Sequence, residues 1–106
     1  MGKYTEVFNP LDVYLVNLGP AATLVAQQLA ENLRDQLPNL RLQLHCGGGD
    51  FKNQLRKADR SGAKVALLLG EDELVRQQVK VKPLRGQGKQ ETIAFVELAT
   101  RLQQIL

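Results

Sequence analysis

The chain has 106 residues, of which 43% are apolar, and a formal net charge of +3. This length accommodates one hydrophobic core and is too short for two ordinary domains. No apolar run approaches the roughly 20 residues of a membrane-spanning helix, and the first ten residues lack the apolar segment of a signal peptide. Cys46 is the single cysteine, which excludes an internal disulfide framework. We therefore expect one domain in a reducing, cytoplasmic setting, with no membrane partner.

The charge is unevenly distributed along the chain. Residues 1–50 carry three Lys/Arg against five Asp/Glu, whereas residues 51–106 carry eleven against six. Any basic face is therefore built by the second half, and a basic face attracts polyanions. Residues 1–10 show no periodicity and end in Asn-Pro, so we predict a linker or tail there and a domain over residues 11–106.

The first two predicted elements are a strand and a long helix. "DVYLVNL" (12–18) is mostly apolar and stops at Gly19-Pro20, which is typical of a buried strand followed by a turn. Pro20 suits a first helical position, and Pro38 disfavours helical geometry at the residue before it. Between the prolines, apolar side chains recur on one helical face: Ala22, Val25, Ala26, Leu29, Ala30, Leu33 and Leu37.

The next segment alternates and then reaches three glycines. "LRLQLHC" (40–46) predicts a strand with leucines on its buried face and with Arg41, Gln43 and His45 on a wetter face. A helix is predicted from about Phe51, with Gly62 placed to end it.

The remaining segments predict three more strands and a last helix. "AKVALLLG" (63–70) is a central strand covered on both faces, and "EDELVRQ" (71–77) is a polar turn with at most one helical turn. "QVKVKPL" (78–84) is a strand, followed by a glycine-rich loop and a short strand ending near Phe95. A last helix is predicted up to the C-terminus, because apolar side chains recur there on one helical face. The order predicts an α/β fold, a three-layer α/β/α sandwich with a five-stranded mixed sheet and three helices.

The three glycines, Gly47 to Gly49, raise the question of a phosphate-binding loop. Neither GxxxxGK[ST] nor GxGxxG after a first strand fits this stretch. A sharp turn with Asp50 capping the next helix is the better interpretation, and nucleotide binding is the weaker alternative.

No group of residues predicts catalysis or a metal site. His45 and Cys46 are neighbours on a strand, so their side chains point to opposite faces and cannot form a nucleophile–base pair. One histidine and one cysteine are too few for a zinc site. The acids Glu71 to Glu73 could hold a hard cation, but a solvated turn is the commoner meaning of such a run.

The cations are better organised. Lys52, Arg56 and Arg60 recur every fourth residue of the second predicted helix, where a plain solvated face is an equally good interpretation. Lys80 and Lys82 project from one side of a strand, and Arg85 and Lys89 follow in the loop: this arrangement predicts a surface for a nucleic-acid backbone. Aromatic residues are few, so base recognition would depend on polar side chains.

Four stretches carry a resemblance to a known family: "GGGDFKNQ", "ADRSGA", "LLLGEDE" and the lysines before "LRG". From about Leu11 to the C-terminus the chain resembles the C-terminal anticodon-binding domain of histidyl-tRNA synthetases, which are class II synthetases. The resemblance implies a domain that binds the anticodon stem-loop of a histidine tRNA. It also implies that histidine activation with ATP and Mg²⁺ belongs to a separate catalytic domain of a homodimeric ligase, so no catalytic residue and no cofactor is expected here.

Positions that match the family suggest site residues. Glu73 in "GEDE" looks like the acid used at the anticodon, since a carboxylate accepts from base amino and imino groups. Lys82 matches a basic residue that reaches a base or phosphate. Candidates near the same edge are Lys80, Lys52, Gln54 and Arg85.

The chain departs from the family pattern at two points, and the sequence also allows an alternative function. "LVRQQ" stands where the family shows a glycine-bearing turn, and "RGQGKQE" replaces a loop close to "SGEQ". The alternative function keeps the fold in a stand-alone regulatory or scaffold paralogue that binds another RNA or a protein.

Overall fold

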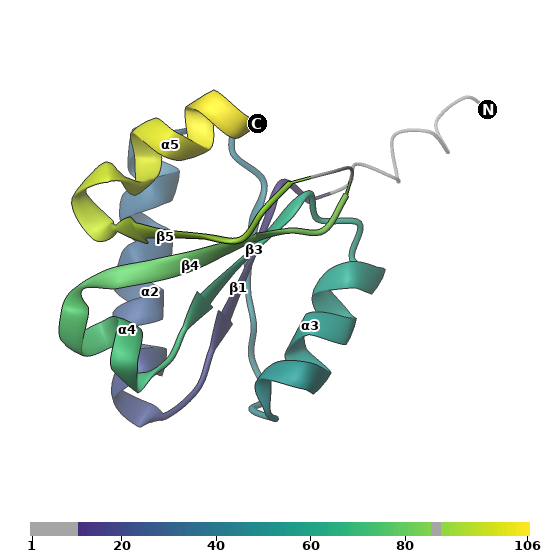
Figure 1. The fold of residues 1–106 in the computed structure, drawn as a ribbon, viewed down its shortest axis with the longest axis vertical. Helices are drawn as coiled ribbons and strands as arrows, with labels where there is room; N and C mark the ends of the chain where they lie inside the picture. Colours follow the sequence, from purple (N-terminus) through teal and green to yellow (C-terminus); the bar gives the residue numbers. More distant parts are fainter. Residues whose placement is uncertain (1–10, 86–87) are drawn as a thin grey trace.

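The computed structural model of the chain describes residues 11–85 and 88–106 (Figure 1). The predicted tail, residues 1–10, and Gly86 and Gln87 of the predicted loop lie outside the described residues. The elements in chain order are β1 (Val13–Asn17), α2 (Pro20–Gln36), β2 (Leu42–Leu44), α3 (Phe51–Arg60), β3 (Val65–Leu69), α4 (Glu71–Arg76), β4 (Gln78–Pro83), β5 (Glu91–Ala94), the 3₁₀ turn η1 (Phe95–Glu97) and α5 (Leu98–Ile105).

The strands form one five-stranded sheet in the order β2-β1-β3-β4-β5. β1 pairs in parallel with β2 and with β3, whereas β4 is antiparallel to both β3 and β5. Helices α2 and α3 supply the crossovers that parallel neighbours require. The predicted mixed sheet is therefore confirmed.

The two faces of the sheet are covered unequally. Figure 1 shows α3 on one side and α2 and α5 on the other. On the α2 and α5 side the core is continuous across the sheet, from Leu42 to Ile93. On the α3 side the helix packs against β1 and β3, while Lys82 of β4 and Thr92 of β5 are exposed. The α3 side of β4 and β5 is thus the face of the described sheet that lies open to solvent.

Glu71–Arg76 form the helix α4, which is longer than the single helical turn that the sequence pattern allowed there. Oε1 of Glu73 accepts a hydrogen bond of 2.9 Å from the backbone N–H of Gly70 and so caps α4. Three acids in the first turn also suit the positive end of the helix. The described domain therefore has four α-helices, one more than predicted. Where the family shows a glycine-bearing turn, Gln77 adopts the left-handed conformation with φ of 55°.

The glycine stretch is the predicted turn and cap. Gly47, Gly48 and Gly49 have φ angles of 102°, 70° and 94°, which side chains other than glycine rarely adopt. The Asp50 carboxylate then accepts a hydrogen bond of 2.9 Å from the backbone N–H of Asn53. This turn sets where α3 starts.

The prediction of a wetter face was wrong at His45, which is 4% exposed. Its Nε2 lies 2.7 Å from the carbonyl oxygen of Gly48, and its Nδ1 lies 2.7 Å from the Tyr14 hydroxyl. A carbonyl only accepts, so Nε2 carries a proton and donates it to Gly48, while the Tyr14 hydroxyl is the partner of Nδ1. Both ring nitrogens are satisfied, which permits burial. Cys46 is exposed, and both residues follow the end of β2 at Leu44 rather than lying within the strand as predicted.

Within residues 11–85 and 88–106, no helix is long and apolar enough to cross a membrane. No group of three or more His, Cys, Asp or Glu side chains there could hold a metal ion.

Candidate nucleic-acid interface

A pocket of about 510 Å³ lies where β1 and β3 end. Because these strands are parallel, the segments that follow them meet at one edge of the sheet, where α/β folds commonly bind ligands. Leu18 and Phe51 form an apolar part of the pocket wall, and Glu73 and Lys80 are polar lining residues. The pocket can therefore offer a flat ring both an apolar surface and hydrogen-bonding groups.

Glu73 and Lys80 are brought together at this edge. Oε2 of Glu73 lies 3.5 Å from Nζ of Lys80, and the two side chains are 11% and 42% exposed. The other oxygen of Glu73 accepts from Gly70. An ionised carboxylate has about four acceptor positions, so Glu73 is held in place by two partners and keeps capacity for a ligand.

The lysines of β4 face the open side of the sheet. Lys80 and Lys82 pair in register with Leu68 and Ala66 of β3, which both belong to the core beneath α3. Thr92 of β5 is opposite Lys80 and is exposed on the same side. The sequence pattern does not point to Thr92, because only the register of β5 against β4 places it opposite Lys80.

Arg85 lies at the opposite end of the sheet from Glu73. It follows Pro83, which pairs with Val65 at the start of β3. Its guanidinium donates to the Asp59 carboxylate at 2.6 Å and to the Asp59 carbonyl oxygen at 2.5 Å. Arg85 therefore connects the end of β4 to the end of α3 and does not join the Glu73 and Lys80 pair.

The two candidates on α3 differ in exposure. Lys52 is exposed in the first turn of the helix, next to Phe51 of the pocket wall. Gln54 is 1% exposed, and its amide bonds the backbone of Asn17 and the carbonyl of Gly49. Gln54 joins α3 to β1 and presents no group to solvent. Its spacing of three from Phe51 and four from Ala58 was the available signal that it points inward.

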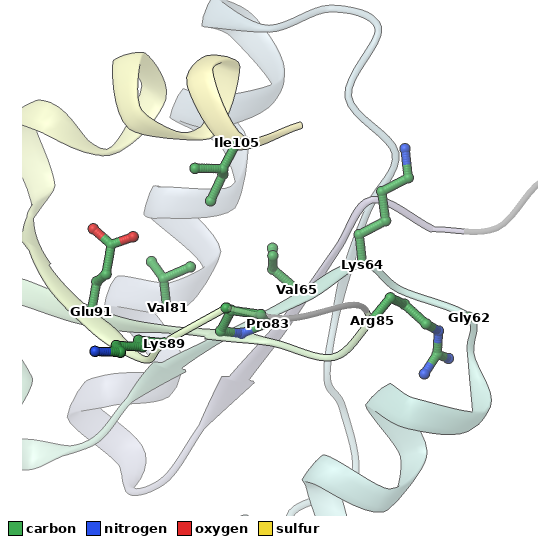
Figure 2. Close-up of a pocket in the computed structure, with 10 residues that line it drawn as sticks. Gly62, Lys64, Val65, Val81, Pro83, Arg85, Lys89, Glu91 and Ile105 are labelled. Carbon is green, nitrogen blue, oxygen red and sulfur yellow. The ribbon is translucent and has the colours of Figure 1, made fainter.

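A larger pocket, of about 680 Å³, lies at the Arg85 end and includes Val65, Val81 and Ile105 in its lining. Lys64, Arg85 and Lys89 also line it, but Figure 2 shows their charged ends directed away from its centre. The Arg85 guanidinium instead reaches Asp59. These cations do not converge, so the pocket is not built to hold a phosphate.

The fold and the family define the class of the protein. A family model described as "Anticodon binding domain" matches residues 12–105, and the chain belongs to this family.

Solved structures with the same fold come from two kinds of synthetase. Apo histidyl-tRNA synthetase of S. aureus is 29% identical, with a TM-score of 0.78 over 89% of this chain. Histidyl-tRNA synthetase of Nostoc sp. PCC 7120 is 23% identical, with a TM-score of 0.82 over 92%. The RNA binding domain of threonyl-tRNA synthetase from Cryptosporidium parvum Iowa II is 13% identical, with a TM-score of 0.80 over 90%. The chain spans 23% of the length of each of these three chains.

Proposed function

We propose that this domain recognises the anticodon stem-loop of histidine tRNA as part of a histidine–tRNA ligase. The observation that carries the proposal is the Glu73 and Lys80 pair in a pocket at the carboxyl ends of β1 and β3. Membership of the anticodon-binding family supports tRNA as the ligand. Histidine is favoured over threonine because identity is 29% with the S. aureus histidyl enzyme and 13% with the threonyl domain.

The pocket suits an unstacked base. The Glu73 carboxylate accepts from base N–H groups, and the wall formed by Leu18 and Phe51 contacts the plane of the ring. Lys82, exposed on the open face, supplies charge for a neighbouring phosphate. Base identity and backbone attraction therefore depend on different side chains.

The rest of the ligase is proposed from the family. The chain matches 23% of the length of the synthetases above, and we assign ATP, Mg²⁺ and histidine transfer to a separate catalytic domain of a homodimeric enzyme. In this assignment the described domain selects the tRNA and carries no reacting group.

Affinity for tRNA tests the proposal directly. The domain is titrated with histidine tRNA, with the same tRNA bearing altered anticodon bases, and with threonine tRNA. We expect each altered anticodon to bind about fivefold to 150-fold more weakly, because a lost base contact costs about 1–3 kcal/mol. Equal affinity for all three RNAs would contradict anticodon recognition. Tighter binding of threonine tRNA would contradict the histidine assignment, and absence of RNA binding would favour a protein-binding paralogue.

A further inference from the structure

Two hydrogen-bonded contacts determine how α3 is rotated above the sheet. Arg85, which follows β4, donates a hydrogen bond to Asp59. The side of the helix that carries Asp59, which we call the Asp59 flank, therefore faces β4. Gln54 is bonded to Asn17 at the end of β1, so the Gln54 flank faces away from β4. In the sheet order β1 and β4 lie on opposite sides of β3, so the two flanks are opposite.

Helical spacing assigns the cations of α3 to these flanks. Residues three, four or seven apart lie on the same side of an α-helix. Lys52 and Arg56 precede Asp59 by seven and three residues and therefore share its flank. Lys57 follows Gln54 by three residues and shares the other flank. All three cations are exposed.

The β4 flank of α3 borders the open face of the sheet. Lys80 and Lys82 lie on that face, and α3 packs against the adjacent strand β3. Four cations thus border one surface, which we name the α3–β4 surface: Lys52, Arg56, Lys80 and Lys82. Two acids of this region have cationic partners, since Asp59 pairs with Arg85 and Glu73 with Lys80. Two exposed acids, Glu71 and Asp72, line the adjoining pocket, so the cations lie to one side of it.

The α3–β4 surface continues from the base pocket. Phe51 and Lys80 line the pocket, and Lys52 follows Phe51 directly. From there Arg56 lies one turn further along α3, and Lys82 lies about 7 Å further along β4. A strand whose base enters the pocket therefore has cations on both sides of its onward path.

We propose that the flank of α3 bearing Lys52 and Arg56 binds the sugar–phosphate backbone of the anticodon loop, opposite Lys80 and Lys82. This rests on the proposed function and adds Arg56 as a binding residue. Cations aligned on two sides of a path attract a chain of phosphates without reading its sequence.

Arg56→Gln and Lys57→Gln form a matched pair that tests the proposal. Both variants remove one positive charge from neighbouring exposed positions of α3, but from opposite flanks. Affinity for histidine tRNA is measured against salt concentration, with circular dichroism confirming the fold. We expect Arg56→Gln to weaken binding severalfold and to reduce the slope of log K against log[salt] by about 0.7. We expect Lys57→Gln to leave the slope unchanged.

Two outcomes would contradict the proposed role of Arg56. Equal slopes for the two variants would overturn the role of Arg56, even if the wild-type domain discriminates between anticodons. A changed preference between anticodon sequences in Arg56→Gln would also overturn a backbone role. If the wild-type domain fails to discriminate between anticodons, the proposed function fails instead, whatever the two slopes are.

Discussion

At the scale of single residues, Gln54 shows how one side chain can be misjudged from sequence. It lies among Lys52, Asn53 and Arg56, so its neighbours suggest a solvated face. In the structure its amide oxygen accepts from the Asn17 N–H at 3.0 Å, and its amide nitrogen donates to the Asn17 and Gly49 carbonyls at 2.7 and 2.8 Å. No local pattern reveals these partners, because Asn17 is 37 residues away in the chain.

We predict that Gln54→Ala lowers the free energy of unfolding by about 1–3 kcal/mol, because it leaves buried backbone groups without partners. Urea unfolding of the domain measures this. Asn53→Ala is the control: Asn53 is exposed, and its replacement should change stability by less than about 0.5 kcal/mol. Equal losses for the two variants would show that the Gln54 bonds do not stabilise the domain.

At the scale of elements, a strong apolar pattern was sufficient to predict a helix or strand, whereas a weak pattern was not. The apolar face between Pro20 and Pro38 predicted α2, and the continuous run of residues 63–70 predicted β3. α4 was predicted only as a polar turn with at most one helical turn, because it has six residues and no buried side chain. Its helical form depends on the cap that Glu73 provides to Gly70, and glutamate at this spacing also occurs in turns.

The last helix is joined to the edge of the sheet by an ion pair. Arg101 of α5 donates to both carboxylate oxygens of Glu91 in β5, at 2.8 and 3.1 Å. The hydrogen bond from Arg101, supported by its charge, lowers the pKa of Glu91. A carboxyl whose pKa is lower in the folded state stabilises the fold above its unfolded pKa, and this contribution disappears as pH falls through the folded pKa.

We therefore predict that Glu91→Gln gives a small decrease in Tm at neutral pH and none in acid below the folded pKa. Thermal unfolding of variant and wild type across this range measures the difference. Glu97→Gln, an exposed acid of η1, controls for a general change in net charge. A Tm difference that stays constant with pH would show that the ion pair is not its source.

At the scale of the whole molecule, the fold brings cations that are far apart in the sequence to one surface. The excess of cations lies in residues 51–106. It does not indicate that Lys52 and Arg56 border the same surface as Lys80 and Lys82. That depends on the rotation of α3 and on the register of β4 against β3, which tertiary contacts determine.

This arrangement predicts that Glu73 and Lys82 have different roles in tRNA binding. Glu73→Gln keeps an oxygen for the Gly70 N–H but removes the charge, so it should reduce discrimination between anticodons and leave the salt dependence of tRNA binding largely unchanged. Lys82→Ala should weaken the binding of all tRNAs to the same extent and reduce the slope of log K against log[salt] by about 0.7. Affinities of both variants for native and altered histidine tRNA, at several salt concentrations, separate the two effects. An unchanged slope for Lys82→Ala would contradict its contact with the backbone.

The position of β1 between β2 and β3 has a consequence for synthesis on the ribosome. Val13 pairs with Leu42 on one side and with Val65 on the other, so the first partner of β1 is translated well before the second. Until residue 69 has emerged, a nascent β1-α2-β2 unit exposes one unpaired and mostly apolar strand edge, which is a site for aggregation. Completion of the sheet must also close a loop of about 50 residues, which slows folding. The nascent chain is therefore most in need of chaperone protection between the translation of β2 and that of β3.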